Sequence, residues 1–154
     1  MASPLTLLMP IIPGTNPMQM AQSLAQFQQE LTSALQSIGT VHYARSLLLD
    51  GSKASLQPGM SPSPNDSFVL AIITEFDGSF DAYVSDFCAQ AGDAFNAMLK
   101  FVVDGAALIP VQNNVTAFGV FIAANNASQQ PPNNGPMFQA YTWTVQQIKA
   151  KMGG

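Results

Sequence analysis

The sequence predicts one α+β domain, in which two amphipathic helices cover one face of an antiparallel sheet. Short runs rich in β-branched and aromatic residues alternate with segments whose apolar residues recur every three or four positions. Hydrophobic residues make up 47% of the 154 residues, which is enough for the core of a single domain. The single Cys excludes a disulfide framework, and the single His excludes a multi-His metal site within one chain.

The first strand is predicted over residues 5–12, an apolar run that a Pro-Gly pair ends. Its prolines favour an edge position, because proline cannot donate to a ladder. The first helix is predicted over residues 17–38, where an Asn-Pro pair gives the start signal and Gly39 the stop signal. One face of this helix is apolar: Leu24, Phe27, Leu31, Leu35 and Ile38.

The middle of the chain predicts two more strands and a second helix. The strands cover residues 41–49 and 68–76, the latter with the sequence FVLAIITEF. Residues 51–67 hold Gly, Ser, Pro and Asn with little periodicity, which indicates a long surface loop. Such a loop is either a lid or interface arm, or a tolerated insertion. After an Asp-Gly-Ser turn, a helical apolar stripe covers residues 80–105.

A fourth strand is predicted over residues 116–123 and a short C-terminal helix over 141–151, with Trp143 as its anchor on the body. The order strand–helix–strand, long loop, strand–helix–strand is the split βαβ pattern of a ferredoxin-like sheet. The chain is therefore expected to form a single domain, residues 1–154, in which residues 125–154 are a C-terminal extension.

The sheet face away from the helices is also rich in apolar residues, so we expect it to be covered. In this topology the common solution packs that face against the sheet of a second copy. A dimeric barrel with a cavity in each protomer would result. Only 9% of the residues are charged, and the net charge is -4, so little charge opposes association of two copies.

The segments VHYARSLLLDG and LAIITEFDGSFDAYVSDF resemble the dimeric α+β barrel superfamily. They are most similar to its small, little-characterised members, in which one strand carries His-aromatic-Ala-Arg and another ends in Phe-Asp-Gly. The similarity covers residues 40–104, with a fainter echo in FQAYTWTVQQIKAKM. It implies the fold but no single activity. The superfamily includes cofactor-free monooxygenases, haem-degrading enzymes, polyketide cyclases, isomerases, chlorite dismutases and dye-decolourising peroxidases.

His42 is the only imidazole and the first candidate for catalysis. If Asp50 pairs with Ser67, His42 falls opposite Glu75 on one sheet face, and a slip of one residue would separate them. A carboxylate that orients an imidazole gives a general acid or base near neutral pH. The alternative is a half-buried His with a structural hydrogen bond. Tyr43 could take the catalytic part if the register slips.

Arg45 and Asp77 are the candidate ligand-binding residues. Arg45 is the only Arg and is expected on the sheet face opposite His42, either in a structural ion pair or as an anchor for an anionic ligand. Asp77 and Gly78 resemble the end of the Gly-x-x-Asp-Gly motif of dye-decolourising peroxidases, whose Asp is an acid above haem. Thr74 stands where that motif begins with Gly. Otherwise Asp77 is a turn residue and cap before the second helix.

Three functions are compatible with these residues, and whether the chain is an enzyme stays open. The first is a cofactor-independent enzyme that acts on a small apolar, aromatic or polyketide-like molecule by proton transfer, cyclisation, isomerisation or oxygenation. His42 would be its base, Glu75 would orient the imidazole, and Tyr43 is the substitute. The second is a haem protein with His42 as axial ligand. The third is a non-catalytic binding or assembly module.

Charge and hydropathy limit the partners. Five Lys+Arg against nine Asp+Glu exclude a basic footprint for nucleic acid. The apolar runs are shorter than the roughly 20 residues that a membrane span needs, so no membrane partner is expected. The N-terminus has no positive region before its apolar residues. The sequence therefore predicts a cytoplasmic homodimer that binds a small apolar molecule, with no cofactor and no metal.

Overall fold

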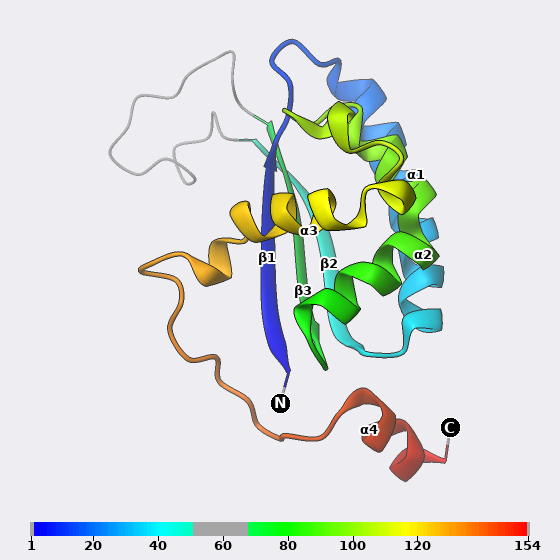
Figure 1. The fold of residues 1–154 in the computed structure, drawn as a ribbon, viewed down its shortest axis with the longest axis vertical. Coiled ribbons are helices and arrows are strands. Elements are labelled where there is room, and N and C mark those ends of the chain that lie inside the picture. Colours follow the sequence, from blue (N-terminus) through cyan, green and yellow to red (C-terminus); the bar gives the residue numbers. More distant parts are fainter. Residues whose placement is uncertain (1, 51–67, 154) are drawn as a thin grey trace.

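The computed structural model describes residues 2–50 and 68–153, and the predicted loop 51–67 lies outside them (Figure 1). Three strands form one antiparallel sheet in the order β1-β3-β2. They are β1 (Ser3–Pro10), β2 (Val41–Asp50) and β3 (Phe68–Phe76). Because β3 lies between β1 and β2, those two strands run parallel to each other and are joined by a crossover helix.

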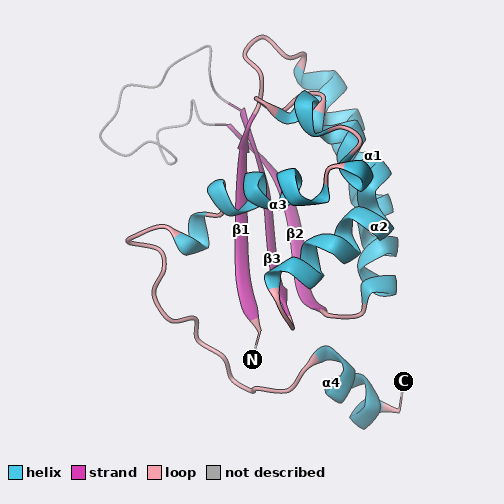
Figure 2. Ribbon diagram, in the orientation of Figure 1, coloured by secondary structure: helices cyan, strands magenta, loops and turns pink. Residues whose placement is uncertain are grey.

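Four α-helices accompany the sheet in the described residues (Figure 2). They are α1 (Pro17–Ile38), α2 (Phe80–Leu99), α3 (Val115–Ala124) and α4 (Val145–Met152). The α+β class predicted from the sequence is confirmed, as is the full extent of the first helix. None of these helices is long and apolar enough to cross a membrane.

Helices α1 and α2 are capped by residues that adjoin their ends. The Asn16 side chain accepts a hydrogen bond from the N–H of Met18 at 2.9 Å and so caps α1. Gly39 adopts φ +67° and ends the helix, a left-handed conformation that other residues rarely adopt. Ser79, rather than Asp77, caps α2, because its hydroxyl accepts the N–H of Ala82.

The core lies between the sheet and the helices, and aromatic rings fill its centre. Phe95 of α2 has the rings of Phe27 and Phe118 at 5.3 Å and that of Phe87 at 5.6 Å, in edge-to-face or similar arrangements. All four side chains are at most 3% exposed. Such ring pairs add to the stabilisation that burial alone provides. This cluster therefore joins α1, α2 and α3 into one packed layer.

The predicted fourth strand is wrong, because residues 115–124 form helix α3. Phe118 and Ile122 lie one helical turn apart, and both are buried. A short apolar run does not distinguish a strand from a buried helix by periodicity alone, and here packing on α2 decides. The sheet of the described residues therefore has three strands and no fourth ferredoxin-like strand.

Two helix ends also differ from the prediction. The second helix stops at Leu99 instead of continuing to Gly105. Gly105 then comes so close to the Leu99 carbonyl that a Cβ would not fit there, so the chain needs glycine where it turns back. The C-terminal helix begins at Val145, four residues later than predicted.

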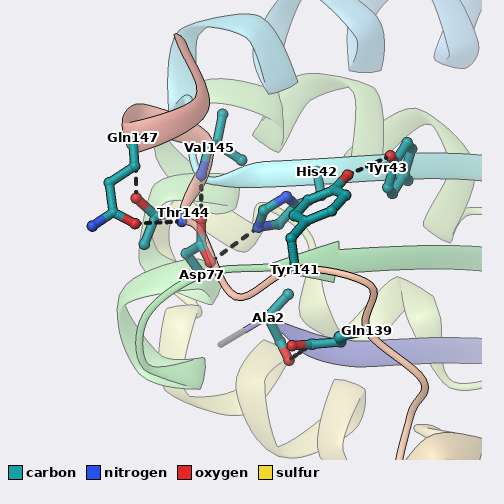
Figure 3. Close-up of polar contacts among 9 residues, drawn as sticks. All are labelled: Ala2, His42, Tyr43, Asp77, Gln139, Tyr141, Thr144, Val145 and Gln147. Carbon is teal, nitrogen blue, oxygen red and sulfur yellow. Dashed lines mark hydrogen bonds and ion pairs between the residues drawn. The ribbon is translucent and has the colours of Figure 1, made fainter. Parts of the chain in front are cut away.

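The sheet face away from the helices is crossed at one end by the C-terminal part of the chain (Figure 3). We call residues 138–143 the crossing segment. Gln139 Nε2 donates to the Ala2 carbonyl at 2.8 Å, and the Tyr141 hydroxyl lies 3.0 Å from that of Tyr43. The segment thus runs from the start of β1 to the start of β2. The dimeric barrel, which would cover this face with a second copy, stays a prediction.

Candidate functional site

A β-bulge at His42 sets the geometry of the candidate site. Val41 pairs with Phe76 and Tyr43 pairs with Glu75, so His42 is the extra residue without a partner in the ladder. Bulges bend a strand and redirect side chains, which is why they occur beside functional sites. The predicted pairing of His42 with Glu75 is therefore wrong, and Tyr43 lies opposite Glu75 instead.

The register of β2 differs by one residue from the prediction, since Asp50 pairs with Phe68 rather than with Ser67. Arg45 pairs with Ile73 on the same sheet face as Tyr43. Arg45 is exposed and forms no ion pair within the described residues, so the structural ion pair expected for it is not found there. It lies outside the pocket described below.

The carboxylate that orients His42 belongs to Asp77. His42 Nε2 and Asp77 Oδ1 are 3.0 Å apart, and the two side chains are only 7% and 10% exposed. An ionised carboxylate accepts hydrogen bonds and cannot donate one, so Nε2 carries the proton and donates it. The other ring nitrogen, Nδ1, then holds the lone pair. Asp77 thus takes the orienting position that the sequence analysis gave to Glu75.

The second oxygen of Asp77 holds the start of helix α4. Oδ2 accepts the N–H of Val145, the first helical residue, at 2.8 Å (Figure 3). A carboxylate at a helix N-terminus is favourable because of the helix dipole. Thr144 and Gln147 complete this helix start with a reciprocal capping box. One carboxylate therefore connects the end of β3, the imidazole and the C-terminal helix.

A pocket of about 230 Å³ lies between the sheet and the crossing segment, and His42 is part of its wall. Three of the predicted site residues, His42, Tyr43 and Glu75, lie in its lining, whereas Arg45 and Asp77 do not. The crossing segment supplies most of the remaining wall. The full lining is Ala2, His42, Tyr43, Glu75, Phe138, Gln139, Ala140, Tyr141 and Trp143.

Two phenol groups meet at the rim of the pocket. The hydroxyls of Tyr43 and Tyr141 are 3.0 Å apart. This hydrogen bond, helped by the nearby charge of Glu75, raises the pKa of Tyr141, so this hydroxyl stays protonated in neutral solution. The pair therefore joins β2 to the crossing segment through a neutral contact.

The Gln139 side chain leaves one acceptor unused beside the pocket. Its Nε2 donates to the Ala2 carbonyl, whereas its Oε1 is buried and has no hydrogen-bond partner within the described residues. A buried acceptor without a donor costs stability, and such exceptions are few in folded proteins. An O–H or N–H group of a bound molecule would satisfy it.

Sequence reasoning missed the aromatic side of the pocket. Phe138, Tyr141 and Trp143 fall within six residues of an otherwise polar segment, and this cluster was the available signal. Trp143 was expected to be an anchor, yet 48% of its surface is exposed. The Lys151 ammonium lies 4.7 Å from the centre of its ring, which is a cation–π contact.

Comparisons with family models, curated proteins and solved structures find no match to this chain. The resemblance to the dimeric α+β barrel superfamily therefore stays a prediction. Across residues 2–50 and 68–153, no group of three or more His, Cys, Asp and Glu side chains is placed to hold a metal ion. The site is thus defined by the imidazole–carboxylate pair and the aromatic pocket beside it.

Proposed function

We propose that the chain binds a small aromatic molecule between the sheet and the crossing segment and that His42 transfers a proton to or from it. One observation carries this proposal: the wall of an aromatic-lined pocket contains an imidazole whose Nε2 is held by a carboxylate. Pockets that combine apolar walls with a few polar groups are the usual sites for small molecules.

The size of the pocket limits the ligand. A cavity of about 150 Å³ is enough to bind benzene. The pocket of about 230 Å³ therefore suits a molecule of one or two rings and is small for an extended polyketide. The aromatic side chains of Tyr43, Tyr141 and Trp143 provide ring faces and edges on which such a molecule can pack.

The polar groups of the pocket are mostly acceptors. The side-chain oxygen Oε1 of Gln139 has no hydrogen-bond donor within the described residues, and Glu75 contributes a carboxylate to the lining. A ligand that offers an O–H or N–H group would satisfy Gln139, which a plain hydrocarbon would leave unpaired. We therefore favour phenols, enols and aromatic amines over hydrocarbons.

The proposed chemistry is acid–base catalysis by one imidazole. Nδ1 takes a proton from an acidic C–H or O–H bond of the ligand, whose electron pair stays on the ligand as an enolate or phenolate. Asp77 keeps the ring oriented and stabilises the imidazolium that forms. Return of the proton to the same or another atom completes an exchange or an isomerisation, the simplest reactions of the class expected from the sequence.

The geometry does not favour the haem alternative. His42 Nε2 is already bonded to Asp77, and the pocket is far smaller than a macrocycle requires. The pocket is complete within one chain, so the proposed function does not depend on a homodimer. The homodimer and the cytoplasmic location stay predictions.

Proton exchange from 2-indanone in D₂O, followed by NMR, tests the proposal. This ketone has two rings, acidic C–H bonds and an enol that carries a hydroxyl donor. Wild type should accelerate the exchange, and His42→Ala should abolish the acceleration. Arg45→Ala is the matched control, since it changes the same strand outside the pocket. Equal exchange rates with wild type and His42→Ala would refute catalysis by this residue.

Binding is measured separately through the fluorescence of Trp143, the only tryptophan of the chain. A saturable change on adding phenol or 2-indanone, without His42-dependent exchange, would support the non-catalytic binding module instead. No saturable change with any phenol, enol or aromatic amine would contradict the site itself.

A further inference from the structure

The two outer edges of the sheet differ in their free backbone donors. Backbone groups of an edge strand point alternately towards the sheet and away from it. The outward positions of β1 are Pro4, Thr6, Leu8 and Pro10. The two prolines have no N–H to offer. Thr6 N donates to Asn126 Oδ1 and Leu8 N to the Asn125 carbonyl, both at 3.0 Å. Every outward donor of β1 is therefore absent or satisfied.

The edge formed by β2 has no partner strand within the described residues. The same alternation directs Tyr43, Arg45 and Leu47 towards β3, so the outward positions are Ala44, Ser46 and Leu48. Within the described residues, none of their three N–H groups has an acceptor. In residues 2–50 and 68–153, the one hydrogen bond to this row comes from Gln28 Nε2, which donates to the Ser46 carbonyl at 3.2 Å. Natural proteins usually protect such an edge with Pro, Lys or a covering segment.

We propose that β2 is an interface with a second copy of this chain. The two β2 strands pair antiparallel around a two-fold axis at Ser46 and join the two sheets into one. An open strand edge is self-complementary, because each copy offers the same alternation of N–H and C=O groups, and a two-fold axis uses one patch on both copies. The proposal does not rest on the proposed function, although the groove beside Ala44 shares His42 and Tyr43 with the lining of the small-molecule pocket.

The side chains favour this register. With the axis at Ser46, Ala44 lies opposite the partner's Leu48. A groove of about 310 Å³ lies beside Ala44, and its apolar members include Leu35, Val41 and Val145. The small side chain of Ala44 leaves this space open. Leu48 is half-buried against the core of its own chain, and the exposed part of the partner's Leu48 would fill the space. An axis at Arg45 would instead place two Arg45 side chains directly opposite each other, which is destabilising.

The charges near this edge are few. Lys149 lines the groove beside Ala44, and the axis at Ser46 keeps the two Arg45 side chains diagonal to each other rather than directly opposite. Helix α1 flanks β2, and its side chains nearest the edge include Gln28, Thr32 and Gln36. Glu30 is the only charged residue in positions 1–41, so two α1 helices can approach with little repulsion. The contact of Gln28 does not block pairing, since a carbonyl oxygen accepts two hydrogen bonds.

Amide hydrogen exchange of the full chain, combined with sedimentation over a range of concentrations, tests the proposal. We expect a dimer that dissociates on dilution. The amides of Ala44, Ser46 and Leu48 should be protected at high concentration only, whereas those of Thr6 and Leu8 should not change. A monomer at every concentration would overturn the proposal. So would a dimer in which the β2 amides exchange freely, which is the result that a face-to-face barrel predicts.

Ala44→Lys tests the register, because it places a charge in the groove that the partner's Leu48 would fill. Ala44 is exposed in the single chain, so the variant should keep the fold, which circular dichroism verifies. The dissociation constant of the dimer should rise about tenfold or more. The matched control Ser33→Lys adds the same charge to α1 away from β2 and should leave the dissociation constant unchanged. Unchanged dimerisation of Ala44→Lys would contradict the edge contact.

Discussion

The two faces of strand β3 show how this molecule separates stability from chemistry. Leu70, Ile72, Thr74 and Phe76 face the helices, and none is more than 3% exposed. On the opposite face, Ile73 is 38% exposed and Glu75 is half-buried beside the crossing segment, whereas Ala71 is fully buried. One face is sealed by packed helices, and the other is covered in part by six residues that leave a pocket. Changes on the first face should therefore alter folding, and changes on the second should alter binding.

Phe95→Ala should have the largest effect, because this ring contacts three other buried rings. We expect a loss of about 3–5 kcal/mol in the free energy of unfolding, measured by urea denaturation. Phe138→Ala is the control from the other face. Its side chain is 89% exposed, so stability should change by less than about 0.5 kcal/mol. Similar losses for both variants would contradict the division between the faces.

Thr74→Val should lower the free energy of unfolding by less, about 1–3 kcal/mol, because it leaves the buried Tyr83 hydroxyl without its 2.6 Å hydrogen bond.

Tyr83 also makes the core sensitive to alkali. Burial raises its pKa above the ordinary value of 10.0, so its stabilising contribution is complete below that pH. This contribution is lost as the pH rises further.

Unfolding experiments on Tyr83→Phe test this linkage. Wild type should lose stability as the pH rises from about 10 to about 11, and the variant should lose less. An equal loss in both proteins would assign the alkaline sensitivity to another group.

Asp77→Asn should affect the pocket face more than the core. The change weakens the bonds to the His42 ring and to the start of α4, each of which involves a carboxylate oxygen. Charge-assisted hydrogen bonds contribute about 1.5–3 kcal/mol each. We expect faster amide exchange in α4 and loss of His42-dependent proton transfer, with the core amides unchanged. Glu75→Gln is the matched control and should leave α4 protected.

Tyr43→Phe should have the smallest effect on stability, below about 1 kcal/mol, because its hydrogen bond with Tyr141 is exposed. The variant also removes the main cause of the raised pKa of Tyr141. An ultraviolet titration of the tyrosines should therefore show Tyr141 ionising at lower pH. No change in that titration would mean that the two hydroxyls do not meet in solution.

The sequence predicted correctly those helices and strands whose capping residues and apolar periodicity lie within the element itself or beside it. Residues 17–38 and 68–76 were predicted with the bounds that the structure has, because the capping residues and apolar periodicity agree there. Residues 116–123 were misread as a strand, although Val115, Phe118 and Ile122 already have helical spacing. Only packing against α2 distinguishes the two interpretations.

The site was predicted in part, and the errors have a physical cause. His42, Tyr43 and Glu75 line one pocket, although the sequence analysis paired His42 with Glu75 and gave Tyr43 only as a substitute for His42. The partner of His42 was wrong, because residues 43–50 pair one residue away from the predicted register and a bulge leaves His42 out of the ladder. No local signal in the sequence indicates either feature. The contribution of the crossing segment depends on contacts such as that between Gln139 and Ala2, which are far apart in sequence.

The most direct test is the ¹⁵N NMR spectrum of the imidazole, since His42 is the only histidine of the chain and both nitrogen signals belong to it. The couplings to the ring C–H protons distinguish Nε2 from Nδ1. In the free protein with a neutral imidazole, we expect a proton on Nε2 and a lone pair on Nδ1. Titration with phenol should shift the Nδ1 signal in a saturable way while Nε2 stays bonded to Asp77. A proton on Nδ1 of the neutral imidazole in the free protein, or an imidazole that does not respond to phenol, would contradict the account.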